Sequence, residues 1–94
     1  MVDLPEDNEL QSTYLRGLAA KLDTLNLARR DLLSDSEEAA DTLRRVAHQL
    51  KGSGATYGFP KISEAAELLE ESDLEAIYFN SGRLIEILKK LIKV

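Results

Sequence analysis

Four segments of the chain carry leucine, isoleucine and alanine at intervals of three or four residues, and this spacing constrains the fold more than any other feature. It is the spacing of a single buried stripe along an α-helix. The expected helices cover residues 8–33, 36–57, 60–72 and 74–93, after an extended lead-in over residues 1–7. Aromatic residues, which β-sheets favour, make up only 5% of the sequence. The sequence therefore predicts an all-α protein.

The predicted core consists of the residues that recur on one face of each segment. The chain has 94 residues, enough for one core, and connections of two or three residues favour antiparallel neighbouring helices. We therefore expect residues 1–94 to form one domain, a monomeric up-down-up-down four-helix bundle. A helical hairpin that dimerises through the same stripes is the alternative. The predicted core residues are Leu10, Tyr14, Leu18, Leu22, Leu25, Ala28 and Leu32; Ala39, Leu43, Val46, Ala47, Leu50 and Gly54; Ile62, Ala65, Ala66 and Leu69; and Leu74, Ile77, Tyr78, Leu84, Ile85, Leu88, Leu91 and Ile92.

Residues typical of helix ends separate these segments. Ser34 begins a capping-box pattern before the second helix, and Ser36 is a rival N-cap. Gly58 is expected to end that helix because glycine tolerates a left-handed backbone. Pro60 suits the first position of the third helix, where no amide hydrogen is needed. Asp73 is the expected cap of the fourth helix.

Composition excludes several classes of site and partner. There is no cysteine, so disulfides and thiolate metal sites are excluded. The net charge of −5 argues against nucleic acid as the main partner. The sequence MVDLPED at residues 1–7 has no signal-peptide character, and no apolar run approaches the roughly 18 residues of a membrane span. We expect a cytoplasmic protein with no membrane partner.

The single histidine, His48, is predicted to point away from the core. At about 100° per residue, the apolar side of its helix lies roughly 140° to 180° from His48, and includes Leu43, Leu50 and Tyr57. A lone histidine is more often part of a core, but this placement argues against that interpretation. The residues expected on the same face as His48 are Asp41, Arg44, Arg45, Lys51, Gly52 and Ala55.

Three kinds of residue beside His48 suggest an exposed reactive site. Gly52 lies one turn beyond it, and a glycine inside a helix costs about 0.5–1 kcal/mol relative to alanine. Close approach of a partner's active site to the imidazole would explain that cost. Lys51 is within helical side-chain reach of His48 and could neutralise an anion there. Arg44 and Arg45 add positive charge, although surface arginines are common.

Phosphoryl transfer is the chemistry that fits an exposed imidazole best. Neutral imidazole is a competent nucleophile near pH 7, and its attack on phosphorus gives a phosphohistidine. The chain offers no convincing magnesium cluster, and the glycines 52 and 54 lie within a helix rather than in a phosphate-binding loop. One histidine without cysteine cannot make a zinc site, and a convex helix provides no pocket for Ser-His-Asp catalysis. We interpret Glu70 and Glu71 as surface charge, because adjacent helical positions point apart.

The segment HQLKGSGATYG, residues 48–58, resembles the motif of the histidine-containing phosphotransfer (HPt) domain, with the pattern H-x-L-K-G-S-[AS]-x-x-[aliphatic]-G. The preceding LRRVA and the following Phe-Pro pair are also similar to that family, and the four-helix layout extends the resemblance over nearly the whole chain. Gly54 stands in place of the usual alanine or serine. Tyr57 replaces an aliphatic residue, and it fits a bundle interior if its hydroxyl reaches water or a partner.

The resemblance implies a phosphoryl carrier of two-component phosphorelays that is not itself an enzyme. By that match His48 is phosphorylated, Lys51 neutralises the phosphoryl group and Gly52 gives access to the ring, while Arg44, Arg45 and Ala55 are candidate partner contacts. The partner would be a receiver domain, whose phospho-aspartate exchanges with His48 using the receiver's own Mg²⁺. Two alternatives stay open. One is the phospho-accepting domain of a chemotaxis-type histidine kinase, and the other is a structural bundle that only binds or dimerises.

Overall fold

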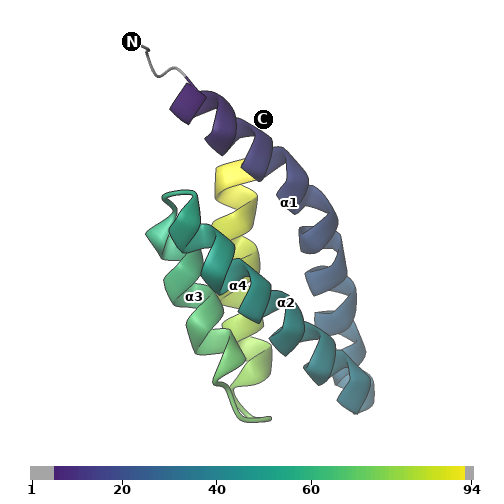
Figure 1. Ribbon diagram of the computed structural model, residues 1–94. Helices are drawn as coiled ribbons and strands as arrows, with labels where there is room; N and C mark the ends of the chain where they lie inside the picture. Colours follow the sequence, from purple (N-terminus) through teal and green to yellow (C-terminus); the bar gives the residue numbers. More distant parts are fainter. Residues whose placement is uncertain (1–5, 93–94) are drawn as a thin grey trace.

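The computed structural model describes residues 6–92, which form four α-helices and one short 3-10 helix (Figure 1). The helices are α1 (Glu6–Asp31), α2 (Glu37–Thr56), α3 (Pro60–Glu70) and α4 (Ile77–Ile92), and the 3-10 helix η1 (Leu32–Ser34) follows α1. The predicted all-α class is confirmed. The lead-in was predicted to be extended over residues 1–7, but Glu6 and Asp7 are already helical; residues 1–5 lie outside the described residues, as does the predicted final helical residue, Lys93.

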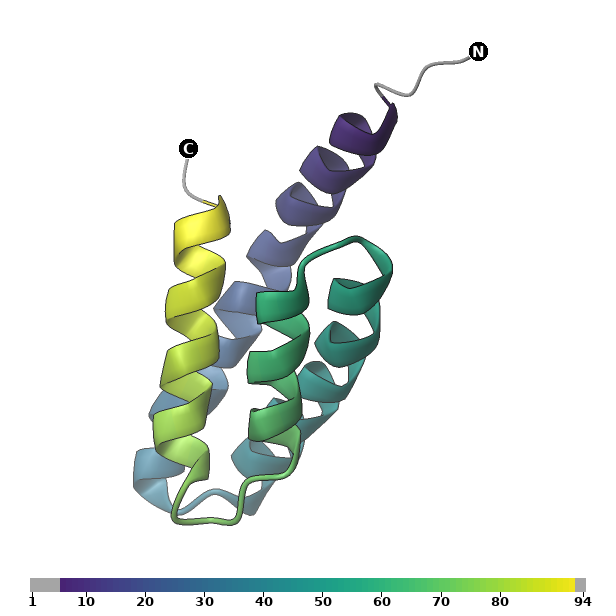
Figure 2. The ribbon, with the colours of Figure 1, turned by 90° about the vertical axis from the view of Figure 1, so that its left-hand side faces the viewer.

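The helices alternate in direction and enclose one core. In Figure 1 the chain descends through α1, rises through α2, descends through α3 and rises through α4. Neighbours in this ring contact each other: α1 packs on α2, α2 on α3, α3 on α4, and α4 on α1. The view turned by 90° shows the first turns of α1 projecting past the connection between α2 and α3 (Figure 2). The up-down-up-down bundle is therefore confirmed.

The predicted stripe of α2 is entirely buried, whereas three predicted core residues elsewhere are exposed. Leu10 is 54% exposed and belongs to the start of α1, whose first turns project past the connection between α2 and α3. Leu74 is 68% exposed because it precedes α4 in a turn, and Tyr78 is 39% exposed beneath the guanidinium of Arg29, 3.7 Å from its ring centre. These three predictions are wrong. The fully buried leucines and isoleucines from all four helices are Leu18, Leu25, Leu43, Leu50, Ile62, Leu69, Ile77, Leu84 and Leu88.

The start of α2 is fixed by a serine cap. The backbone N–H of Ala39 donates to the Oγ of Ser36 at 3.1 Å, and Ser36 has an extended backbone. The rival N-cap is therefore the one used, and the capping box predicted at Ser34 does not form. Ser34 instead ends η1, and Asp35 follows it in a left-handed conformation with φ 59°.

The end of α2 is a Schellman motif. The N–H of Phe59 donates to the carbonyl of Gly54 at 2.7 Å, and the N–H of Gly58 donates to Ala55 at 3.3 Å. Gly58 has φ 86°, the left-handed conformation expected from the sequence. Tyr57 is the C-cap residue and stacks on Tyr14 with ring centres 4.6 Å apart. Because Tyr57 remains 38% exposed at this end, its predicted interior position is wrong.

Pro60 and Asp73 mark the starts of the third helix and of the turn before the fourth helix. Pro60 is the first residue of α3, as predicted. Asp73 accepts a hydrogen bond from the N–H of Ala76 at 2.9 Å, so it caps a turn over residues 74–76. The N–H of Ile77 donates to the carbonyl of Asp73 at 3.0 Å, so this turn leads into α4, which starts three residues later than predicted, at Ile77. No helix among residues 6–92 is long and apolar enough to cross a membrane.

Gly54 allows α2 and α3 to pack closely. A Cβ at this position would lie 3.0 Å from the backbone nitrogen of Ser63 and 3.1 Å from Cγ2 of Ile62. The two helices are also tied by the Oγ of Ser63, which donates to the carbonyl of Lys51 at 2.8 Å. This close pairing places the last turn of α3 beside the middle of α2.

Candidate functional site

His48 lies in the middle of α2 on the face that points away from the core. Its side chain is 69% exposed, whereas Leu50, two residues further along α2, is fully buried. This arrangement agrees with the helical geometry predicted from the sequence. The imidazole is therefore accessible to another molecule, while its backbone belongs to a helix whose opposite face is packed in the core.

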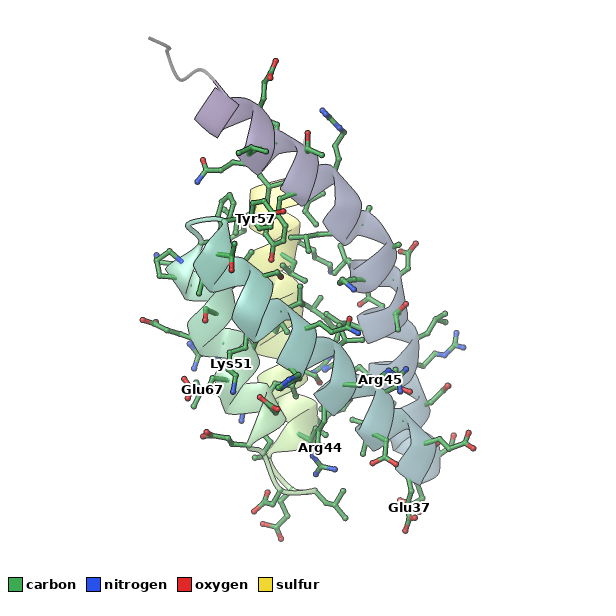
Figure 3. All side chains as sticks on the ribbon, viewed as in Figure 1. Glu37, Arg44, Arg45, Lys51, Tyr57 and Glu67 are labelled. Atoms are coloured by element: carbon green, nitrogen blue, oxygen red, sulfur yellow. The ribbon has the colours of Figure 1, made fainter. Side chains whose placement is uncertain are left out.

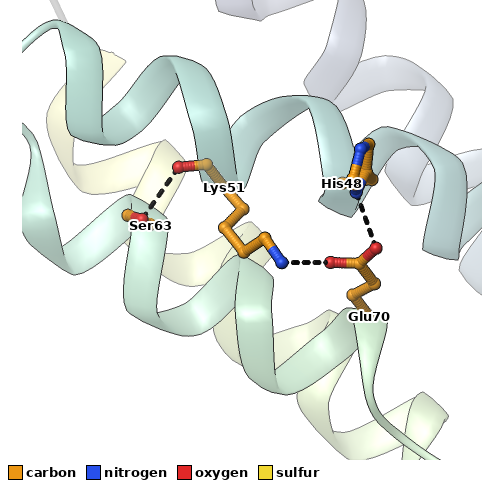
Figure 4. A network of polar contacts seen from close by, with 4 residues as sticks. All are labelled: His48, Lys51, Ser63 and Glu70. Carbon is orange, nitrogen blue, oxygen red and sulfur yellow. Dashed lines mark hydrogen bonds and ion pairs between the residues drawn. The ribbon is translucent and has the colours of Figure 1, made fainter.

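One nitrogen of the imidazole is held by a glutamate from the next helix. Nδ1 of His48 lies 2.7 Å from Oε2 of Glu70, the last residue of α3 (Figure 4). The interpretation of Glu70 as surface charge was wrong, because its side chain is only 27% exposed and reaches across to α2. His48 and Glu70 each lie eleven residues from Phe59, which is in the short connection between the two helices. This symmetry about the turn is the signal that could have found the pair.

The second oxygen of Glu70 holds Lys51. Its Oε1 lies 3.0 Å from Nζ of Lys51, so one carboxylate bridges two residues of α2 (Figure 4). Lys51 was predicted to place its charge near His48. In the structure its ammonium group contacts the same carboxylate, that of Glu70, as the imidazole does. The Lys51 side chain is 37% exposed, and so its ammonium group borders both Glu70 and the solvent.

The charges of this cluster reinforce one another. The close ion pair with Lys51, together with the hydrogen bond from His48, holds the pKa of Glu70 below its ordinary value. The close ion pair with Glu70 raises the pKa of Lys51, and the nearby carboxylates of Glu67 and Glu71 add to that effect. Figure 3 labels Lys51 and Glu67 on their neighbouring helices. At neutral pH the site therefore holds an ionised carboxylate and a charged ammonium group.

The ionised state of Glu70 determines how the hydrogen atoms of the imidazole are placed. A carboxylate has no hydrogen to donate, so Nδ1 of His48 must be the donor in the 2.7 Å hydrogen bond. In the neutral imidazole only one nitrogen carries hydrogen, and the other carries a free lone pair. The lone pair is therefore on Nε2, the nitrogen that makes no contact with Glu70.

Gly52 leaves open space next to the ring. A Cβ at this position would meet no heavy atom within 4 Å, in contrast to the crowded position of Gly54. Gly52 is exposed and lies one turn after His48 on the same face of α2. The absence of a side chain there is not required by packing within the domain.

The three candidate partner contacts differ in their surroundings. Arg45 and Ala55 are exposed on α2, on the same face as His48 (Figure 3 labels Arg45). Arg44 is partly buried, and its Nη2 donates to the backbone carbonyl of Ser72 at 3.0 Å, after the end of α3. Arg44 is therefore engaged within the domain. Among residues 6–92, no three histidine, aspartate or glutamate side chains are grouped so as to hold a metal ion.

A comparison with protein-family models identifies the family. The model described as the Hpt domain matches residues 9–92, nearly the whole chain. The chain belongs to the Hpt domain family. Neither the curated proteins nor the solved structures contain a match to it. Hpt domains are helical phosphocarriers of two-component signalling that interact with receiver domains and have no catalytic activity of their own.

Proposed function

We propose that His48 carries the phosphoryl group of this Hpt domain and exchanges it with the phospho-aspartate of a receiver domain. The observation that carries this proposal is the fixed orientation of an exposed imidazole, with Nδ1 bonded to Glu70 at 2.7 Å and Nε2 left free. A nucleophile held in one orientation by a neighbouring group is a recurring feature of covalent transfer.

The transfer proceeds by attack of Nε2 on phosphorus. The lone pair of Nε2 forms the nitrogen–phosphorus bond as the bond between phosphorus and the aspartyl oxygen breaks, and the aspartate leaves as a carboxylate. Nδ1 keeps its hydrogen throughout, so the phosphorylated ring carries positive charge. The carboxylate of Glu70, 2.7 Å from Nδ1, stabilises that charge. The return transfer reverses these steps without moving a proton.

Lys51 can interact with two anionic groups during the transfer, the carboxylate of Glu70 and the phosphoryl group. It pairs with Glu70 at 3.0 Å before phosphorylation, and its ammonium group borders the solvent beside His48. A phosphoryl group on Nε2 would bring further negative charge to this face, and Lys51 would neutralise part of it. We expect Mg²⁺, which phosphoryl transfer commonly uses, to be bound by the partner.

The partner is expected to dock on the exposed face of α2. Gly52 leaves room for its active site beside the ring, since no atom lies within 4 Å of the missing Cβ. Arg45 and Ala55 are exposed on either side of His48 along the helix and are the proposed contacts. Arg44 is a weaker candidate for partner contact, because its guanidinium already bonds Ser72.

The experiment that tests this proposal is a transfer assay with a labelled receiver. Purified domain is mixed with a phosphorylated receiver domain and Mg²⁺, with His48→Gln in parallel. We expect a phosphate that is labile in acid and stable in alkali on the wild-type domain alone. Label of that kind on His48→Gln would overturn the assignment.

The donor in this assay also separates two roles for the same site. Labelling of His48 by an ATP-loaded kinase domain, and by no receiver, would identify the chain as the phospho-accepting domain of a chemotaxis-type kinase. Labelling by neither donor, together with concentration-dependent association, would favour a structural bundle.

A further inference from the structure

Glu70 is the last residue of α3, a position where helices fray unless another group holds the end. Yet its two oxygens make separate contacts with α2, at 2.7 Å to His48 and 3.0 Å to Lys51. Both contacts depend on where the end of α3 lies relative to α2. The residues that fix this end therefore fix the orientation of the imidazole.

We propose that Arg44, Ser72 and Asn80 form a polar hub that positions Glu70 against His48. The proposal deepens the proposed function, since it concerns how the same imidazole is oriented. Ser72 lies two residues after Glu70 and is only 8% exposed. Each of the three residues comes from a different part of the bundle, Arg44 from α2, Ser72 from the segment after α3, and Asn80 from α4.

The hydroxyl, the carbonyl and the N–H of Ser72 all make hydrogen bonds. Its hydroxyl donates to the carbonyl of Leu68 at 2.7 Å and accepts from Nδ2 of Asn80 at 2.7 Å. Its carbonyl accepts from Nη2 of Arg44 at 3.0 Å, and its N–H donates to Leu69 at 3.1 Å. The carbonyl of Leu68 would otherwise be one of the unsatisfied groups of a helix end. The hub thus closes the last turn of α3 and ties it to both neighbours.

The position of Arg44 connects the hub directly to the site. Arg44 lies four residues before His48, one turn away along α2. The same helix therefore carries the imidazole and grips the segment that follows Glu70. Ser63 makes the corresponding tie nearer the start of α3, where its Oγ donates to the carbonyl of Lys51 at 2.8 Å. Between these two ties α3 has a fixed register on α2, and Glu70 spans His48 and Lys51.

The test uses the free domain and the nitrogen signals of its imidazole in NMR spectra. His48 is the only histidine, so these signals need no assignment. In the neutral ring of the wild-type domain we expect Nδ1 to show the shift of a protonated nitrogen and Nε2 that of an unprotonated one. Arg44→Ala should move both signals toward those of a histidine in an unstructured peptide, because Glu70 no longer holds the ring steadily.

Asn80→Ala approaches the hub from α4 and provides a second, milder variant. We expect the same direction of change in the imidazole signals, and for both variants a fall of about tenfold in the rate of transfer from a phosphorylated receiver. Arg44→Lys keeps a cation that can donate to the carbonyl of Ser72, and it should recover most of the wild-type signals. Arg45→Ala is the matched control, since Arg45 is exposed beside Arg44 and should leave the signals of the free domain unchanged.

A purely structural hub would give a different result. Arg44→Ala and Asn80→Ala would then lower the melting temperature but leave both imidazole signals at their wild-type positions, which would overturn the proposal. The spectra are recorded well below the melting temperature of each variant, with helicity confirmed by circular dichroism. Because they are recorded without a receiver, they decide the role of the hub even if the transfer assay identifies another donor.

Discussion

The buried and exposed faces of α2 each carry a glycine, and the surroundings of these two glycines differ. On the buried face Gly54 has no room for a Cβ, which would lie 3.0 Å from the backbone of Ser63. On the exposed face Gly52, two residues earlier, has nothing within 4 Å. The first glycine is explained by packing of α2 on α3, and the second has no explanation within the domain. The difference separates a buried face that stabilises the bundle from an exposed face on which we propose that the partner docks.

The largest expected loss of stability comes from the buried face. Leu50 is fully buried, and Leu50→Ala should lower the free energy of unfolding by about 2–5 kcal/mol, because it removes apolar contacts and leaves a cavity. Urea denaturation measures this change. A loss below about 1 kcal/mol would contradict the assignment of the buried face. The control is Gln49→Ala, which removes an exposed side chain whose Oε1 accepts from Lys21.

On the exposed face a large substitution should affect transfer and not folding. Gly52→Leu fills the open space beside His48, and we expect the transfer rate to fall by about tenfold or more, since small misplacements of reacting groups have large effects. The urea midpoint should not fall, because leucine favours the helix more than glycine. An unchanged transfer rate would remove the access role of Gly52.

A single methyl group distinguishes the two glycines with the least perturbation. Gly52→Ala should stabilise the domain by about 0.5–1 kcal/mol, the difference in helix propensity. Gly54→Ala gains the same propensity but forces contacts with Ser63 and Ile62, and overpacking typically costs about 1–3 kcal/mol. Since Ile62 is fully buried and Ser63 presents its backbone, we expect Gly54→Ala to be destabilising. Equal effects in urea denaturation would abolish the contrast between the two faces.

The smallest expected effect on stability is the dependence on pH at Glu70. Lys51 and His48 hold the pKa of Glu70 below its ordinary value of 4.5, so folding favours the ionised form. Its contribution is present above about pH 4.5 and is lost as the pH falls through the lower pKa of the folded state. We expect Glu70→Gln to lower the urea midpoint at pH 7, with a difference that shrinks on acidification below that range. Glu71→Gln, which changes an exposed neighbour, is the control; a difference that grew in acid would contradict the pairing.

The contribution of Lys51 to stability has the opposite dependence on pH, since it is lost in alkali rather than in acid. Glu70 raises the pKa of Lys51 above its ordinary value of 10.5. This contribution is complete below about pH 10.5 and is lost as the pH rises through the raised pKa. The Glu70–Lys51 pair is therefore expected to be fully formed throughout the neutral range in which transfer is assayed.

The sequence predicted the parts of this molecule that follow from a single helix. The buried stripe of α2 and the outward direction of His48 depend only on the period of one helix. Gly58 marked the end of α2, and Pro60 marked the start of α3. The exposure of Leu10 could not be predicted, because it depends on how far α1 extends beyond its neighbours. Leu74 fits the stripe of α4, but the turn capped by Asp73 separates it from the helix.

Contacts between helices were harder to predict than the helices themselves. Glu70 looked like surface charge because its own helix gives no reason for it to be anything else. Its role appears only when the register of α3 on α2 is known, which depends on Gly54, Ser63 and the turn between the helices. The bond between Arg44 and Ser72 was not predicted either, because it joins residues that are 28 positions apart in the sequence. From its own helix, Arg44 could be interpreted only as a candidate partner contact.

The most direct test of the account is to determine which nitrogen of His48 receives the phosphoryl group. The ¹⁵N-labelled domain is phosphorylated by a receiver, and coupling between ³¹P and ¹⁵N identifies the bonded nitrogen. Because Glu70 holds Nδ1, we predict that phosphorus is bonded to Nε2 and that Nδ1 remains protonated. Phosphorus on Nδ1, or on any residue other than His48, would contradict the account.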